Sequence, residues 1–292
     1  MNASFGIDHP LLATHDIESL RNLLMAIGFN MTAIGKHPWG TSTSLAMFNG
    51  CLIEIMGIYD DTLIDEVPAG DFRFGRHVYE HLQNREGVAL TALHSTNSKA
   101  DAQRAQATGF TVAGHLEFGR DVTLPDGTEG RTKTTLALLP DAQFPRLSFF
   151  LCQQHKPELI YVKEWLKHPN KVTGICGVNI VASEQHHPAL KARFGSLYGG
   201  SEIIAGGFQC KTANGVMRIM DAANFSRTIG LLPETVVKDD TPCVAGMDLT
   251  MPDPQVVADF LNTAEVDYQE ISNGIVLTSP VLTANTLMRF IE

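Results

Sequence analysis

Apolar and polar residues follow one another in a repeated order along this chain, and the first 58 residues show that order clearly. Residues 5–13 alternate loosely, as a half-buried β-strand does. Asp16 then offers a helix N-cap, apolar residues follow at helical spacing, and Gly28 is a typical helix end. Two further apolar stretches meet at Asn49-Gly50, a dipeptide typical of tight hairpins. The pattern predicts a β-α-β-β-β unit.

The same order returns three more times in the remaining chain. The second copy has a helix that ends at Gly109-Phe110 and strands around an Asp126-Gly127 turn. The third begins at "GICGVNIVAS", and the fourth begins at "VAGMDLTM". Some β-α-β-β repetition occurs in any α+β protein, but four copies that cover nearly the whole chain indicate an internal repeat. We therefore expect two domains of two units each: residues 1–156, a linker at 157–172, and residues 173–292.

Composition limits the classes of function. The chain has 44% hydrophobic residues and a mean hydropathy of -0.01, which is typical of a soluble globular protein. A formal net charge of -10 argues against nucleic-acid binding, which needs clustered Lys and Arg. No apolar stretch approaches the ~20 residues of a membrane helix, and the N-terminus lacks the regions of a signal peptide. The five cysteines have no CxxC spacing, so we expect reduced thiols and a cytoplasmic location.

Several short motifs resemble the vicinal oxygen chelate superfamily, and in particular its glyoxalase-like branch. They are "IDH" in the first strand, "GF" after the first helix, "HPWGT" at residues 37–41 and "LIEIMG" at residues 52–57, with "FFLCQQHKPE" and "LKHPN" further on. The resemblance implies that the modules pair and that each pair wraps a cupped mixed sheet around a pocket. The superfamily includes glyoxalase I, extradiol dioxygenases, fosfomycin-resistance enzymes and metal-free bleomycin-binding proteins. It therefore predicts the fold far better than the reaction.

The resemblance also implies a metal site, because each module of the metal-using members supplies one ligand from its first strand and one from its fourth. His9 and Glu54 stand at these two positions of the first module. An imidazole and a carboxylate suit Zn, Ni, Mn or Fe(II), which would polarise a substrate carbonyl. In the second module Leu90 and Phe150 stand at the matching positions, so the ligand set is incomplete. The candidates for a displaced third ligand are His94, Cys152 and Gln153.

His9 and Glu54 also have readings that need no metal. A histidine on a buried strand is often a core residue bonded to a backbone carbonyl. Glu54 lies within the apolar stretch "CLIEIMGI", where an unpaired carboxylate in a dry interior would be costly. It must therefore face solvent, a partner or a wet cavity. Because both residues stand at matching places in the module, we predict a shared site with Glu54 as its catalytic base.

A second group of residues is predicted to line a ligand pocket. Trp39 can form a wall for a flat or apolar ligand, although packing between modules is an equal alternative. His155 follows a buried strand and would be either a base at the rim or a solvated turn residue. Cys152 would be either a pocket residue or an inert buried thiol. The predicted pocket residues are His37, Trp39, Cys152, Gln153 and His155.

The second half of the chain lacks the histidine and glutamate of the first. Arg218 and Arg289 stand where carboxylates would be expected. Arg218 could bind an anion through two parallel hydrogen bonds, but an arginine on a strand more often faces solvent. We expect this half to be a structural partner or a separate ligand pocket.

Taken together, these features favour a lyase or isomerase that acts on a small carbonyl or oxygenated substrate, with or without a divalent metal. A metal-free protein that binds and sequesters a small molecule is the alternative. A relative of the ring-cleaving dioxygenases is a third hypothesis, although that class needs two histidines and a glutamate. The expected partner is a small molecule, and the internal duplication is compatible with a monomer or a homodimer.

Overall fold

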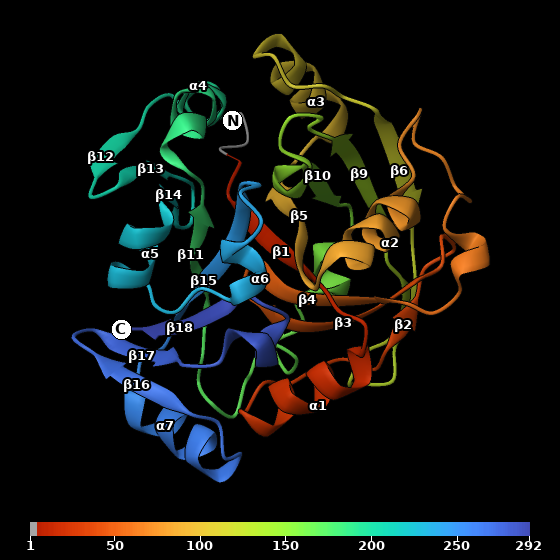
Figure 1. Ribbon diagram of the computed structural model, residues 1–292. Coiled ribbons are helices and arrows are strands. Elements are labelled where there is room, and N and C mark those ends of the chain that lie inside the picture. The colour runs from red at the N-terminus through yellow and green to blue at the C-terminus, as the bar shows by residue number, and fades with distance from the viewer. Residues whose placement is uncertain (1–4) are drawn as a thin grey trace.

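Two curled eight-stranded sheets make up most of the described chain (Figure 1). The computed structural model describes residues 5–292. Residues 1–4 belong to the N-terminal stretch that is expected to lack a signal peptide, and they lie outside the described residues. Within residues 5–292, no helix is both long enough and apolar enough to cross a membrane.

The first sheet joins the first two modules, and its strand order is β2-β3-β4-β1-β5-β10-β9-β6. In each module the first strand pairs in parallel with the last, and the modules meet where β1 and β5 pair antiparallel. A separate hairpin, β7-β8, is inserted between β6 and β9. The strands are β1 (Ile7–Ala13), β2 (Gly35–Lys36), β3 (Thr41–Phe48), β4 (Cys51–Ile58), β5 (Gly87–His94), β6 (Gly114–Phe118), β7 (Asp121–Thr123), β8 (Glu129–Arg131), β9 (Thr134–Leu139) and β10 (Phe149–Gln154).

The second sheet repeats this topology with the order β12-β13-β14-β11-β15-β18-β17-β16. Its modules meet at the antiparallel pair β11 and β15. The predicted α+β fold, with four modules paired into two cupped mixed sheets, is confirmed. The strands are β11 (Gly174–Val181), β12 (Glu202–Ile204), β13 (Gly207–Lys211), β14 (Val216–Met220), β15 (Cys243–Thr250), β16 (Tyr268–Ile271), β17 (Gly274–Leu277) and β18 (Leu287–Ile291).

The local signals in the sequence act as predicted at several element ends. The Asp16 carboxylate accepts a hydrogen bond from the Ser19 amide at 2.9 Å and so caps the first helix. Gly28 ends that helix region with φ 89°, and Gly50 turns β3 into β4 with φ 84°. The helices are α1 (Ile17–Ala26), α2 (Phe74–Asn84), α3 (Ser98–Ala107), α4 (His187–Tyr198), α5 (Ala222–Thr228), α6 (Glu234–Val237) and α7 (Pro254–Thr263).

Apolar side chains form three cores among the described residues. The largest lies between the two sheets and includes residues of α1, α3, α4 and α7. The other two lie on the opposite, concave faces. Phe74 of α2 and Phe150 of β10 belong to the one on the first sheet, and Phe225 of α5 belongs to the one on the second. The sheets therefore pack back to back, and each concave face is covered separately.

Two side chains from the second half of the chain, one in the turn between β13 and β14 and one at the end of α4, also bond to the backbone at the start of the first half. Asn214 accepts a hydrogen bond from the Ile7 amide through Oδ1 and donates one to the Ile7 carbonyl through Nδ2, both at 2.8 Å. The Tyr198 hydroxyl donates to the Phe5 carbonyl at 3.0 Å. These contacts hold the start of β1, which carries His9, against the second sheet.

Replacing Asn214 by alanine is expected to lower the free energy of unfolding by about 1–3 kcal/mol, because both polar groups of Ile7 lose their partner. Urea denaturation of the wild type and the variant measures this loss. Asn262→Ala is the matched control, since that amide is exposed and makes one long bond to the Tyr268 hydroxyl at 3.4 Å. An equal loss in both variants would show that Asn214 does not hold the sheets together.

Candidate functional site

The concave face of the first sheet encloses a cavity of about 570 Å³, a size that suits a small organic ligand. Its walls are mainly apolar and aromatic, with a few polar side chains among them. The segment between the sheets also contributes Leu159, Ile160 and Trp165, so the predicted linker forms part of the wall. The aromatic side chains of the wall are Trp39, Phe74, Phe118, Phe150 and Trp165.

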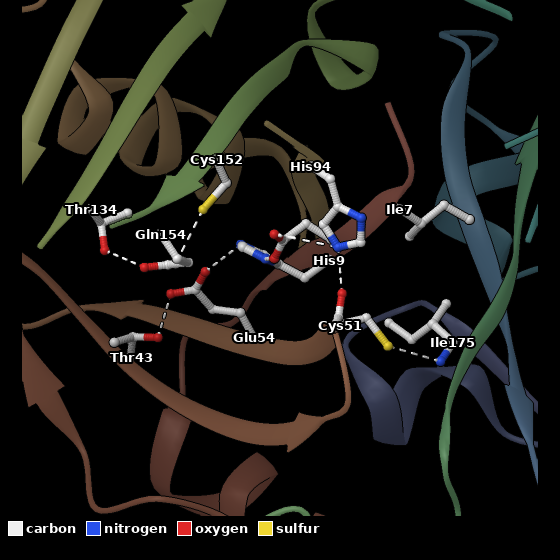
Figure 2. A network of polar contacts seen from close by, with 12 residues as sticks. Ile7, His9, Thr43, Cys51, Glu54, His94, Thr134, Cys152, Gln154 and Ile175 are labelled. Atoms are coloured by element: carbon white, nitrogen blue, oxygen red, sulfur yellow. Dashed lines mark hydrogen bonds and ion pairs between the residues drawn. The ribbon is translucent and has the colours of Figure 1, made fainter. Parts of the chain in front are cut away.

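His9 and Glu54 lie side by side in this cavity (Figure 2). His9 Nε2 is 2.9 Å from Glu54 Oε2, and His9 Nδ1 is 2.7 Å from Asp8 Oδ1. The other oxygen of Glu54 accepts a hydrogen bond from the Thr43 hydroxyl at 2.6 Å. Asp8, His9 and Glu54 therefore form a chain of alternating acidic and basic groups, all of them buried. The predicted juxtaposition of imidazole and carboxylate is present.

An irregularity in strand pairing brings Asp8 into this chain. The pairing of β1 with β5 shifts its register between Ile7 and His9, so Asp8 has no partner on β5. Such a bulge bends the strand and redirects side chains, and bulges are common next to active sites. Here the Asp8 carboxylate reaches the ring of the very next residue. Asp8 thus fixes the orientation of the imidazole whose other nitrogen faces Glu54.

The charges of Asp8, His9 and Glu54 stabilise one another. Burial alone would lower the pKa of His9, but the hydrogen bond to Asp8 and the contact with Glu54 outweigh it and raise the pKa to about 9. Burial alone would raise the pKa of Glu54, but the hydrogen bond and the charge of His9 lower it to about 2. At neutral pH His9 is therefore an imidazolium between two carboxylates.

This pairing predicts a pH-dependent contribution to stability. Since the pKa of His9 is raised to about 9 in the folded protein, its contribution is complete below the unfolded value of about 6.5 and is lost as pH rises through 9. The advantage of the wild type over His9→Gln in free energy of unfolding is expected to shrink by on the order of 3 kcal/mol across that range. Urea titrations at several pH values measure it. Parallel pH profiles for the two proteins would contradict the ion pairing.

His37 and Trp39 also line the cavity, as predicted for pocket residues, and their rings stack with centroids 4.6 Å apart. Phe118 packs edge-on against both rings. His37 Nδ1 lies 2.9 Å from the Thr41 hydroxyl, and His37 Nε2 contacts the guanidinium of Arg120. Because a guanidinium can only donate, Nε2 accepts and the ring proton is on Nδ1. Burial and the charge of Arg120 lower the pKa of His37 to about 3, so this ring is neutral.

The strand β10 places its predicted residues on two different faces. Cys152 lines the cavity, but Gln153 and His155 do not. Gln153 bonds to the Ser98 amide and the Thr96 carbonyl on the α3 side, and the exposed His155 bonds to the Thr135 hydroxyl. The reason is that β10 and β9 pair without a bulge, so the alternation of faces continues. The cavity instead receives Gln154, which donates to Cys152 Sγ at 3.3 Å.

His94, the candidate third metal ligand, is not among the residues that line the cavity. Its Nε2 contacts the Gly50 carbonyl and is 3.6 Å from Asp8 Oδ2. Within residues 5–292, no three His, Cys, Asp or Glu side chains are arranged to hold a metal ion. His9 and Glu54 are then the two donors of this kind that meet in the cavity, and two donors bind a divalent ion poorly. The residues present therefore do not fit a divalent metal.

The matching place in the second sheet is filled by an ion network. By strand register, Arg218 stands at the place of Glu54, and Gly177 stands at the place of His9. Arg218 pairs with the residue two places after Gly177, and Glu54 pairs with the residue two places after His9. A side chain at Gly177 would meet Asp248 Oδ2 at 2.8 Å. The two sequence-based readings of Arg218, a solvent-facing side chain or an anion site, do not describe its position. Its Nη1 instead donates a hydrogen bond to Asp248 Oδ2 at 2.6 Å. Arg289 adds a two-pronged contact to the same carboxylate.

Three residues of the site were not predicted from the sequence. Gln154 and Arg120 line the cavity, and Asp8 contacts His9 from outside the lining. Asp8 was detectable, since "IDHP" places two ionisable residues side by side in an apolar strand. Gln154 differs from the predicted Gln153 by one position, which only the strand register decides. Arg120 stands between β6 and the hairpin β7-β8, and no local pattern marks it.

Comparison with known proteins gives one family match. A family model described as a glyoxalase-like domain matches residues 7–195. No curated protein matches the chain.

Solved structures share the fold at low sequence identity. A hypothetical protein from Staphylococcus aureus is 12% identical, with a TM-score of 0.67 and 98% of each chain covered. A variant of 4-hydroxymandelate synthase from Streptomyces coelicolor is 11% identical, with a TM-score of 0.57, and the match covers 100% of this chain and 93% of that one. A xylose isomerase-like TIM barrel/4-hydroxyphenylpyruvate dioxygenase fusion protein is 13% identical, with a TM-score of 0.55, and 100% of this chain matches 50% of the fusion.

Proposed function

Since the chain belongs to the glyoxalase-like domain family, we propose that it is a lyase or isomerase that moves a proton on a small carbonyl compound bound in the cavity of the first sheet. Glu54 acts as the base and the His9 imidazolium acts as the acid. The observation that carries this proposal is the buried ion pair of His9 and Glu54 in a mainly apolar cavity. Buried charges are costly, and they are common where a protein needs acid and base together.

The proposed step uses only the two side chains and the substrate, and its protons and electrons balance. The Glu54 carboxylate removes a proton from the carbon next to the carbonyl, and the electron pair of that C–H bond becomes the C=C bond of an enol. The carbonyl oxygen takes the proton that His9 Nε2 donates. Glu54 is then protonated and His9 is neutral. Because their atoms lie 2.9 Å apart, the proton returns from Glu54 to His9.

The shifted pKa values couple the two proton transfers. The charge of His9 is one cause of the low pKa of Glu54. As His9 gives its proton to the substrate, that charge disappears and the carboxylate becomes a stronger base. Asp8 has the supporting role, because it holds the imidazole through Nδ1. Conversely, Glu54 is one cause of the raised pKa of His9, so the imidazolium becomes a stronger acid as the carboxylate takes its proton.

Hydrogen exchange tests this proposal with probes that fit an aromatic cavity. Phenylacetone and phenylpyruvate each carry an acidic C–H group between a phenyl ring and a carbonyl. In D2O, the protein is expected to speed the loss of that proton signal in the NMR spectrum at least about 100-fold above buffer. Rates equal to buffer for both probes would overturn the proposal.

The second candidate function is metal-free binding of a small aromatic or hydrophobic molecule. The apolar and aromatic wall of the cavity favours it. Saturable binding of the same probes without exchange would support this function instead. Elemental analysis of protein purified without chelator completes the comparison. Stoichiometric metal that is lost in both His9→Ala and Glu54→Ala would replace the acid–base pair with a metal centre.

A further inference from the structure

Arg120 differs from the other charged side chains of the cavity because no carboxylate among residues 5–292 lies within ion-pair distance of it, and the charge of Glu54 acts on it only from further away. Glu54 contacts His9, and Asp121 accepts a hydrogen bond from Arg131 at 2.8 Å. In the part of the chain that the structure describes, Arg120 has no acidic group within ion-pair distance. Its guanidinium meets only the neutral ring of His37. A partly buried cation without a counter-charge is unfavourable unless a ligand supplies one.

The surroundings hold the guanidinium in a defined position. The Arg120 amide donates to the Thr132 hydroxyl at 2.9 Å, and the Arg120 carbonyl accepts from the Thr132 amide at 2.8 Å. His37 is itself fixed by its stacking on Trp39 and by Thr41. Gly35 leaves room for the guanidinium, since a Cβ there would lie 2.8 Å from Arg120 Nη1. Such positioning favours recognition by a rigid fork of donors.

We propose that Arg120 binds a carboxylate group of the ligand, so that the cavity selects small carbonyl compounds that are also carboxylate anions. This inference rests on the proposed function only for the carbonyl part of the ligand. One N–H of the guanidinium is used by His37, and a carboxylate can accept from the remaining donors. The His37 nitrogen that accepts from Arg120 cannot neutralise it, so the positive charge stays available to the ligand.

Two matched probes test the inference by isothermal titration calorimetry. Phenylpyruvate and phenylacetone share the benzyl ketone, and they differ in carrying a carboxylate or a methyl group. Phenylpyruvate is expected to bind the wild-type protein at least about tenfold more tightly than phenylacetone. In Arg120→Met its dissociation constant should rise about 10- to 100-fold, while that of phenylacetone changes less than about twofold. Unchanged phenylacetone binding also shows that the variant cavity is intact.

Two further variants sharpen the result. Arg120→Lys keeps the charge but loses the fork, so it should bind phenylpyruvate with intermediate affinity. Arg76→Met is the matched control, because this partly exposed arginine of α2 pairs with Asp65 and neither residue lines the cavity. It should leave both affinities unchanged.

The outcomes separate this inference from the proposed function. Equal affinities for the two probes, no phenylpyruvate binding at millimolar concentration, or an Arg120→Met variant that keeps the preference would each overturn the carboxylate site. The Glu54→Gln protein provides the separation, because it retains Arg120 while losing the base. A preference for phenylpyruvate without hydrogen exchange in the wild type keeps the carboxylate site and removes the catalytic role. Hydrogen exchange in the wild type without a preference for phenylpyruvate keeps the catalytic role and removes the carboxylate site.

Discussion

Replacing Glu54 by glutamine is expected to slow hydrogen exchange of phenylacetone and phenylpyruvate by about 10²–10⁴-fold, the range typical of losing a general base. Glutamine has nearly the same shape but cannot take a proton at neutral pH. It also leaves His9 paired with Asp8 at 2.7 Å, so the imidazole keeps one of its two partners. NMR exchange rates in D2O measure the loss, and calorimetry with the same probes shows whether binding is retained.

Glu86→Gln is the matched control for this change. Glu86 accepts hydrogen bonds from the Thr14 hydroxyl and the His15 amide, and it lies outside the cavity. The same substitution there should leave the exchange rate unchanged. If Glu54→Gln also exchanged within about threefold of the wild-type rate, Glu54 would not be the base.

Asp248→Asn is expected to destabilise the protein by about 3–5 kcal/mol, because it leaves buried positive charge without a partner. The Asp248 carboxylate accepts four hydrogen bonds, two from Arg289 and one each from Arg218 and Asn179. Asparagine would turn one acceptor into a donor that faces guanidinium N–H groups. Urea denaturation at neutral pH measures the difference in free energy of unfolding between the variant and the wild type.

The control for Asp248 is Asp253→Asn, directly before α7 in the same half of the chain. Asp253 pairs with Lys171 at 3.3 Å, and both side chains are well exposed, so its loss should cost less than about 1 kcal/mol. The pH dependence gives a second check. Burial opposes ionisation of Asp248, yet Arg289 and Arg218 lower its pKa below the usual range. The stabilising contribution is therefore complete above about pH 4 and is lost as pH falls through the folded pKa. A variant as stable as the wild type at neutral pH would contradict the network.

The two halves of the chain use one architecture in different ways. In the first sheet, the concave face keeps a cavity that contains the ion pair of His9 and Glu54. In the second, the matching place contains Gly177 and a closed network around Asp248. That network uses the hydrogen-bonding groups that an open site would present to a ligand. The two sheets share a common core, and the expectation that the second half is a structural partner or a separate ligand pocket stays a prediction.

The sequence by itself determined the modules and the central pair of the site. Helix caps, glycine turns and apolar spacing act over a few residues, so Asp16, Gly28 and Asn49-Gly50 predicted their elements correctly. His9 and Glu54 were also within reach of sequence reasoning. Their strands occupy fixed places in a repeated module, and a glutamate in an apolar strand must have a partner.

Only the tertiary structure decided which other residues meet that pair. A bulge at Asp8 brings a second carboxylate to His9, while regular pairing of β10 directs Gln154 into the cavity and Gln153 away from it. Arg120 reaches His37 across 83 positions of sequence separation. Local patterns cannot report such contacts, because a shift of one residue in register moves a side chain to the other face of a sheet.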